Sequence, residues 1–167
     1  QMKHAPRNRL AVMLSHLAGL RVGEIAALTL LDVFDADGNV REQLRLSAAI
    51  TKGGHARTVF LNERLRHEIE RFSMDRPENG DADAPLLLTQ KRTPFSANTL
   101  CQLMGQIYKL AGLEGATSHS GRRWFITRLA HSGVSSKVMT FAGHRNLTTT
   151  QRYIDVRDDM MRAAVEL

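Results

Sequence analysis

Helical and strand-like residue patterns occupy separate stretches of the chain, and this separation limits the folds that it can adopt. Apolar residues recur at helical spacing between Pro6 and Gly19, which predicts a first helix over about residues 7–18. After a turn, residues 22–28 are typical of a short second helix. Over residues 30–61 the spacing of apolar residues changes to the alternation expected of strands.

Turn-forming residues divide this strand-like stretch. Asp37-Gly38 and Lys52-Gly53-Gly54 are turn signals, so we predict a small antiparallel sheet of about three strands. Helical patterns then return, with Asn62 and Ser96 as candidate caps, over about residues 63–74, 97–111, 119–131, 135–142 and 147–153. The expected fold is therefore α+β and mostly helical, with a three-stranded antiparallel sheet beside a helical bundle.

The composition is that of a basic globular protein, with 23 Lys and Arg against 17 Asp and Glu, and a pI near 10.1. This balance favours a polyanionic partner such as nucleic acid, although basic proteins of other classes share it. The single cysteine, Cys101, excludes an intrachain disulfide framework and a thiolate metal cluster, and indicates a reducing, cytosolic setting. The most apolar stretch, LAVMLSHLAGL, is too short and too polar to span a bilayer.

Six residues suited to phosphodiester chemistry are spread along the chain: Arg21, Lys52, His119, Arg122, His144 and Tyr153. Two short segments carry four of them, HSGRR and GHRNLTTTQRY, and the others lie in GLRVGE and ITKGGHARTVFL. In the first segment the histidine and arginine are three residues apart, which places them on one face of a helix. The spacing therefore predicts a composite site built from distant parts of the chain.

Each of these residue types has a role in metal-free cleavage of a phosphodiester. The guanidinium groups of Arg21 and Arg122 can clamp the phosphate and stabilise the charge of its transition state. His119 can accept the proton of the nucleophile, because imidazole titrates near neutrality. Tyr153 is the candidate nucleophile, since a phenol with a pKa of roughly 10 ionises more readily than serine and leaves more readily afterwards.

The two remaining residues can assist the leaving group. Lys52, on a turn and near arginines that lower the pKa of an ammonium group, can protonate the departing 5′-oxygen. His144 can hydrogen-bond the phosphate or that oxygen. Taken singly, such residues are more often an ion pair, a turn lysine, a packed aromatic or a helix cap. Their joint presence in this order favours the catalytic interpretation.

The order and setting of the six residues closely resemble the catalytic domain of the tyrosine recombinases, the phage integrase family, over about residues 8–155. In that family the first arginine follows a Gly-Leu-type turn and precedes an acidic residue, here Glu24. Two departures stand beside the second arginine. Arg123 occupies a position that is commonly His, and Ser120-Gly121 replaces the usual Asp-Leu pair.

The resemblance implies a metal- and ATP-independent DNA strand transferase that acts in site-specific recombination, without a cofactor. Tyr153 would form a 3′-phosphotyrosyl link, with double-stranded DNA as the partner and four protomers assembled on two DNA sites. A monomer is the expected state without DNA, in the cytoplasm and associated with the nucleoid. Because the chain opens QMKHAPRNRL without an initiating Met, we expect residues 1–167 to be the catalytic domain alone, with the N-terminal DNA-binding domain absent.

Three alternatives remain open at this point. A type IB topoisomerase uses the same chemistry but relaxes supercoils without exchanging partners. A non-catalytic DNA-binding accessory module would bind DNA without forming a covalent link. A metal-dependent nuclease is the weakest alternative, because the carboxylates cluster in a loop and the tail without the framing of metal ligands.

Overall fold

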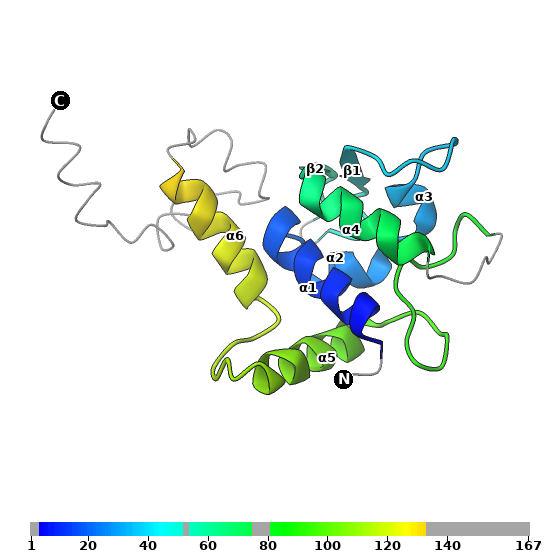
Figure 1. The fold of residues 1–167 in the computed structure, drawn as a ribbon. Helices are drawn as coiled ribbons and strands as arrows, with labels where there is room; N and C mark the ends of the chain where they lie inside the picture. Colours follow the sequence, from blue (N-terminus) through cyan, green and yellow to red (C-terminus); the bar gives the residue numbers. More distant parts are fainter. Residues whose placement is uncertain (1–3, 52–53, 75–80, 133–167) are drawn as a thin grey trace, which may run out of the picture. The chain divides into compact units, whose positions relative to one another are not determined.

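The computed structural model describes residues 4–51, 54–74 and 81–132 (Figure 1). In chain order the described elements are α1 (Ala5–Ala18), α2 (Val22–Ala27), α3 (Leu30–Val33), β1 (Gln43–Leu46), β2 (Arg57–Phe60), α4 (Glu63–Met74), α5 (Ala97–Leu110) and α6 (Ser120–His131). Helices account for most of this secondary structure, and one small antiparallel sheet accompanies them. The predicted class, α+β and mostly helical, is confirmed.

The ends of three helices follow local signals in the sequence. α1 ends at Gly19, which adopts the left-handed conformation (φ 63°) that favours glycine. α4 begins after Asn62, whose side-chain oxygen accepts a hydrogen bond from the backbone N–H three residues later at 2.9 Å. Ser96 caps α5 in the same way at 3.1 Å. The predicted caps at Asn62 and Ser96 are therefore confirmed. Each of their bonds satisfies a backbone N–H that the first helical turn leaves unpaired.

The predicted third strand is wrong, because residues 30–33 form the short helix α3. Thr29 and Asp32 cap this helix reciprocally. The Asp32 carboxylate accepts the Thr29 N–H at 2.8 Å, and the Thr29 hydroxyl oxygen accepts the Asp32 N–H at 3.4 Å. Phe34 and Val40 then meet in an isolated bridge, so the described part of the chain holds a sheet of two strands.

The two strands form a hairpin that presents one face to the core. Leu44 and Leu46 of β1 are fully buried, and the residues between and before them are exposed. Leu46 is the register partner of Arg57, the first residue of β2, at the end of the sheet nearest the connecting loop. The predicted turn at Lys52-Gly53 falls in that loop, but these two residues lie outside the described part.

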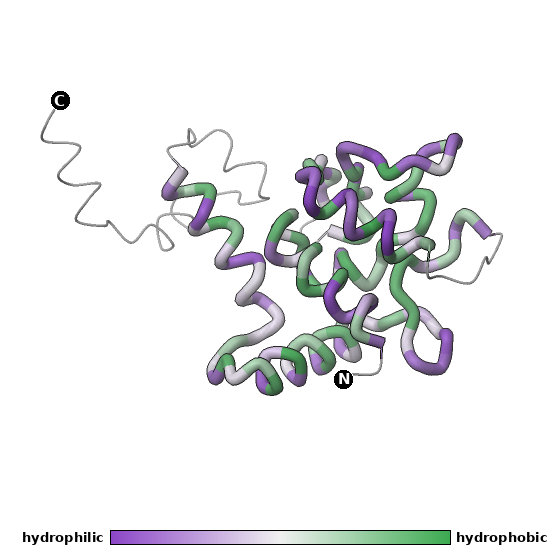
Figure 2. Tube along the Cα trace, viewed as in Figure 1, coloured by the Kyte–Doolittle hydropathy of each residue, from purple (hydrophilic) through white to green (hydrophobic). Residues whose placement is uncertain are grey.

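The hydrophobic core lies among α1, α2, α4, α5 and the sheet. α1 packs against α2, α4 and α5, and α2 packs against α5. Figure 2 shows hydrophobic residues along α1 and α2 and mostly hydrophilic residues along α4. The short apolar segment after the loop also enters the core as predicted, since Leu86 and Leu87 are each 1% exposed. The largest fully buried side chains include Leu10, Leu14, Leu20, Ile25, Leu28, Leu65, Ile69 and Leu100.

The chain divides into two compact units, residues 1–125 and residues 126–167. The boundary falls inside α6, so the first part of this helix belongs to the first unit. None of the described helices combines the length and the apolar character needed to cross a membrane. The helices predicted at 135–142 and 147–153 lie outside the described residues.

Candidate active site

Arg21 is held at the junction of α1 and α2. The left-handed Gly19 ends α1, and its N–H donates to the Leu14 carbonyl. Leu20 is fully buried, so it anchors the turn in the core. Arg21 follows as the residue that immediately precedes α2, with a side chain that is 22% exposed. The predicted Gly-Leu turn before a helix is therefore present, and it fixes the backbone from which this arginine extends.

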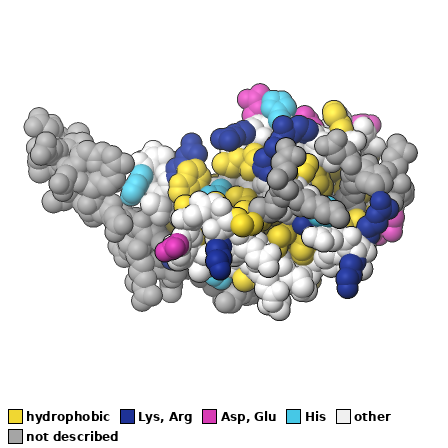
Figure 3. All heavy atoms as spheres, turned by 60° about the horizontal axis from the view of Figure 1, so that its bottom comes forward, with side chains coloured by type: hydrophobic (Ala, Val, Ile, Leu, Met, Phe, Trp, Pro, Cys, Tyr) yellow, Lys and Arg dark blue, Asp and Glu magenta, His cyan; other side chains and the backbone are white. Residues whose placement is uncertain are grey.

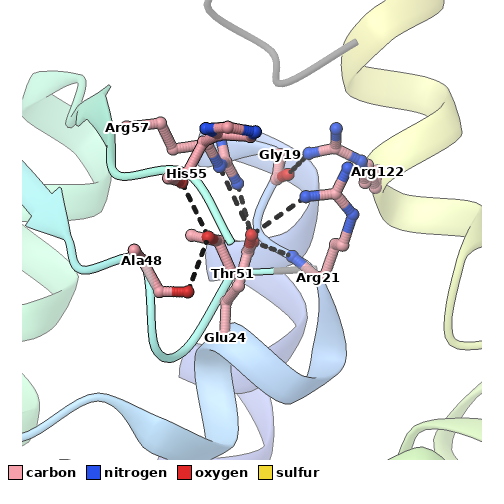
Figure 4. A network of polar contacts seen from close by, with 8 residues as sticks. All are labelled: Gly19, Arg21, Glu24, Ala48, Thr51, His55, Arg57 and Arg122. Carbon is pink, nitrogen blue, oxygen red and sulfur yellow. Dashed lines mark hydrogen bonds and ion pairs between the residues drawn. The ribbon is translucent and has the colours of Figure 1, made fainter. Parts of the chain in front are cut away.

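Glu24, on the first turn of α2, is the buried counter-charge of this arginine. Its carboxylate accepts the Arg21 N–H at 2.7 Å and the Arg21 Nη1 at 3.0 Å. Arg57 donates to the same carboxylate from Nη2 at 2.6 Å and from Nε at 3.3 Å (Figure 4). Glu24 is 1% exposed, and such a buried charge is tolerated only with partners of this kind.

The surroundings keep Glu24 ionised. Burial by itself raises the pKa of this carboxyl, but the hydrogen bonds from Arg57 and from the Arg21 backbone act in the opposite direction. The two guanidinium charges add to that effect, and the pKa of Glu24 ends below its ordinary value. The sequence showed Glu24 as the acidic residue three positions after Arg21, but it carried no signal that Arg57 would join them.

Arg122, near the end of residues 1–125, contacts the same turn between α1 and α2. It lies on α6, is 6% exposed, and donates a hydrogen bond from Nη1 to the Gly19 carbonyl. These two residues are 103 positions apart in the chain. A Cβ added at Gly19 would collide with the ring of Phe125, also on α6. The fold thus brings two of the predicted site arginines to the backbone of one turn (Figure 4).

The start of α6 packs closely on α1, which explains the small residue beside Arg122. A Cβ at Gly121 would lie 2.5 Å from Ser15 Oγ and 2.6 Å from His16 Nδ1. The His16 ring also lies 6.1 Å from the Tyr108 ring and 5.8 Å from the Trp124 ring, centroid to centroid. Gly121 therefore fits a contact in which a larger side chain would have no space.

His119 is exposed and directly precedes α6. Its backbone N–H donates to Thr117 Oγ1 at 3.3 Å, and its carbonyl accepts the N–H of Arg123 at 2.9 Å. The neighbouring Ser118 is buried, and its Oγ accepts the thiol of Cys101 at 3.2 Å. Among the described residues, no hydrogen bond joins the His119 ring to the two arginines.

Three predicted site residues lie outside the described residues: Lys52, His144 and Tyr153. Around the first of them, Thr51 closes the described part of the hairpin loop. Its hydroxyl donates to the carbonyls of Ala48 and His55, at 3.3 and 2.7 Å. In the ranges that the structure covers, no three His, Cys, Asp or Glu side chains are grouped to hold a metal ion.

Basic side chains stand on one face of the described part of the chain. On the face shown in Figure 3, Lys and Arg side chains stand among apolar and other polar atoms, and they form no single continuous patch. Arg123 is one exposed example, and its Nη2 donates to Ser120 Oγ at 3.2 Å.

The profile of the phage integrase family matches residues 2–160, and the chain belongs to this family. It is 32% identical over 165 residues to tyrosine recombinase XerA of Pyrococcus horikoshii, covering 96% of this chain and 54% of XerA. It is 27% identical over 157 residues to tyrosine recombinase XerC of Pelobacter propionicus, covering 93% of this chain and 49% of XerC. The chain thus spans about half the length of these curated relatives.

Solved structures share the fold. The integrase of transposon Tn1549, in complex with circular intermediate DNA, matches with a TM-score of 0.75 at 24% identity, over 99% of this chain and 59% of that chain. The XerA recombinase crystal structure matches with a TM-score of 0.73 at 22% identity, over 96% and 55% of the two chains. These likenesses confirm the predicted tyrosine recombinase catalytic fold.

Proposed function

We propose that the chain is the catalytic domain of a site-specific DNA recombinase that cleaves and rejoins DNA through Tyr153. The observation that carries the proposal is the meeting of two distant arginines at one turn. Arg122 hydrogen-bonds to the Gly19 carbonyl, two residues before Arg21. Two guanidinium groups at one place suit a phosphate, because each offers parallel donors and stays charged at neutral pH.

The proposed reaction begins with attack of the Tyr153 oxygen on the scissile phosphorus. The bond from phosphorus to the 5′-oxygen breaks, and a 3′-phosphotyrosyl ester forms. His119 takes the proton of the phenol, and Lys52 gives a proton to the departing 5′-oxygen. The arginines stabilise the charge that gathers on the non-bridging oxygens, which is usually the largest catalytic contribution.

The second step reverses the first on a different strand. A 5′-hydroxyl from the partner duplex attacks the phosphotyrosyl ester, and the bond from phosphorus to Tyr153 breaks. His144 hydrogen-bonds the phosphate in both steps. Because the ester conserves the energy of the cleaved bond, the exchange needs neither ATP nor a metal ion.

Double-stranded DNA is the proposed partner, with four protomers on two sites and a monomer in the absence of DNA. The Tn1549 integrase and XerH were solved in complex with circular intermediate DNA and with a palindromic difH substrate, respectively, which supports this partner. The basic net charge of +6 is consistent with it. We place the protein at the nucleoid in the cytoplasm.

The test is covalent trapping on nicked DNA. The complete gene product is incubated with nicked duplexes from the DNA that flanks its gene, and the products are separated on denaturing gels beside Tyr153→Phe. We expect a protein–DNA adduct that maps to Tyr153 and disappears in the variant. Tight binding without an adduct would contradict the proposal and favour an accessory binding module. An adduct that relaxes supercoils without exchange between duplexes would favour a topoisomerase.

A further inference from the structure

Glu24 is a buried charged group that the proposed reaction does not use directly. Its two oxygens receive four hydrogen bonds, two from Arg21 and two from Arg57. An ionised carboxylate offers about four lone-pair positions, so these contacts match its capacity. With an exposed fraction of 1%, Glu24 joins the two arginines inside the protein instead of at its surface.

Arg57 brings the β-hairpin into this arrangement. It is the first residue of β2, its side chain is 11% exposed, and its ion pair with Glu24 measures 2.6 Å. The loop that precedes it contains Lys52, and Thr51 at the other side of that loop bonds to the carbonyl of His55. The ion pair therefore attaches the strand that follows the loop to the first turn of α2 (Figure 4).

Because Arg57 and Arg21 share the carboxylate of Glu24, the charge of Arg57 affects how strongly Arg21 can attract a phosphate. Two guanidinium charges face one carboxylate, so the group of three keeps a net positive charge. If the Arg57 charge were removed, the buried carboxylate would be balanced by Arg21, whose attraction for a phosphate would fall. The backbone N–H bond from Arg21 would keep the carboxylate at the start of α2 in either case.

We propose that Arg57 is a positioning residue that acts through Glu24, holding the Arg21 guanidinium in place and coupling it to the hairpin that carries Lys52. This inference rests on the proposed function of Arg21 as a phosphate-binding group. It assigns to Arg57 no contact with DNA, in keeping with its small exposed fraction.

The first experiment compares Arg57→Met with Arg45→Met in the complete gene product. Arg45 is an exposed arginine of β1 on the same sheet, so both variants lose one positive charge and both keep an unbranched side chain. At saturating nicked duplex, we expect Arg57→Met to slow single-turnover adduct formation on the order of tenfold to a hundredfold. Duplex affinity should fall by a much smaller factor in both variants, since the weakened Arg21 contact is one of many phosphate contacts that hold a duplex. A larger loss of affinity in Arg57→Met with an unchanged rate would overturn the proposal and indicate direct DNA binding.

The second experiment asks whether Arg57 acts through Glu24. Glu24→Gln is combined with Arg57→Met, because a neutral amide can bond to Arg21 without cancelling its charge. We expect the double variant to form adduct no more slowly than Arg57→Met alone, which is the non-additivity expected of a shared path. Losses that simply multiply would contradict the coupling. Arg57→Lys, which keeps the charge, should recover most of the rate. Arg57→Gln, which removes the charge but keeps a side-chain N–H donor, replaces Arg57→Met if that variant does not fold.

A measurement without DNA separates this inference from the proposed function. Carbon-13 NMR of the Glu24 carboxyl is followed through an acid titration in the parent, Arg57→Met and Arg45→Met. We expect the pKa of Glu24 to rise in Arg57→Met, because burial remains while one of the two guanidinium partners is lost, and to stay unchanged in Arg45→Met. An unchanged pKa in Arg57→Met would overturn the link. A parent that forms no adduct would count against the recombinase proposal alone, since the titration is read independently.

Discussion

Two buried glutamates, Glu24 and Glu68, have the same kind of partners but different surroundings. Each pairs with an arginine three residues away on its own helix or cap, and each also receives a second arginine from a distant element. At Glu68 these partners, Arg9 and Arg71, are 48% and 56% exposed. At Glu24 the partners are 22% and 11% exposed.

This difference separates a surface ion-pair group from a candidate active site. Water screens the exposed arginines at Glu68, so their attraction for the carboxylate contributes little to stability. The enclosed group at Glu24 has little access to water, so each of its contacts depends on the others. The same pair of residue types at i,i+3 spacing therefore contributes differently at Glu24 and at Glu68. Burial decides which of the two groups can hold a guanidinium in a fixed place.

The largest expected effect comes from removing each carboxylate in turn. Glu24→Met should lower the free energy of unfolding by about 3–5 kcal/mol, because it leaves two mostly enclosed guanidinium groups without their counter-charge. Glu68→Met should cost about 1 kcal/mol or less, because its arginines can turn to water. Urea unfolding of both variants beside the parent measures the difference. Equal losses would show that burial does not distinguish the two groups.

A smaller effect is expected at the turn that supports the enclosed group. Gly19→Ala should cost more than Gly112→Ala, although both glycines have a positive φ, 63° and 72°. Each substitution strains the left-handed backbone by about 1–2 kcal/mol. At Gly19 the added Cβ also collides with Phe125, while nothing lies within 4 Å at Gly112. Overpacking should add about 1–3 kcal/mol. Thermal unfolding compares the variants. Equal decreases in unfolding temperature would mean that the ring of Phe125 can move away from Gly19 at little energetic cost.

The smallest expected effect is on the acid dependence of stability. Burial raises the pKa of Glu24, but its bonds to Arg57 and Arg21 outweigh burial and bring the pKa below its ordinary value. The group therefore stabilises the fold above the unfolded glutamate pKa of about 4.3, and this contribution is lost as the pH falls through the lower folded pKa. Glu24→Gln should make the fall of unfolding free energy below that pH shallower. Urea unfolding at several acidic pH values tests this, and identical slopes would contradict it.

The local features of the fold could be predicted because their causes lie within a few residues. Asn62 and Ser96 begin helices by accepting a backbone N–H three residues later. The error at residues 30–33 has an equally local cause. Thr29 and Asp32 have the spacing of a reciprocal cap, and that signal outweighed the apolar pattern that favoured a strand.

The sequence offered a list of candidate site residues, but not the contacts that join them. The arginines at positions 21 and 122 followed from motifs, but Arg57 carried no signal, because its partner is 33 residues away on another element. The functional roles of all six residues stay predictions: Arg21, Lys52, His119, Arg122, His144 and Tyr153. Gly121 was noted as a departure from the family pattern, and its close approach to Ser15 and His16 became visible only with α1 and α6 in place.

The sequence by itself determined the helix ends, the i,i+3 ion pairs and the family motifs, because these depend on neighbours along the chain. The tertiary structure decided which ion pair is enclosed, and that Arg122 reaches the Gly19 carbonyl at the turn before Arg21. Both outcomes depend on how whole elements pack, since burial changes the cost of a charge far more than its sequence spacing does. A pattern of residues can therefore name the members of such a site, whereas packing determines which of them act together.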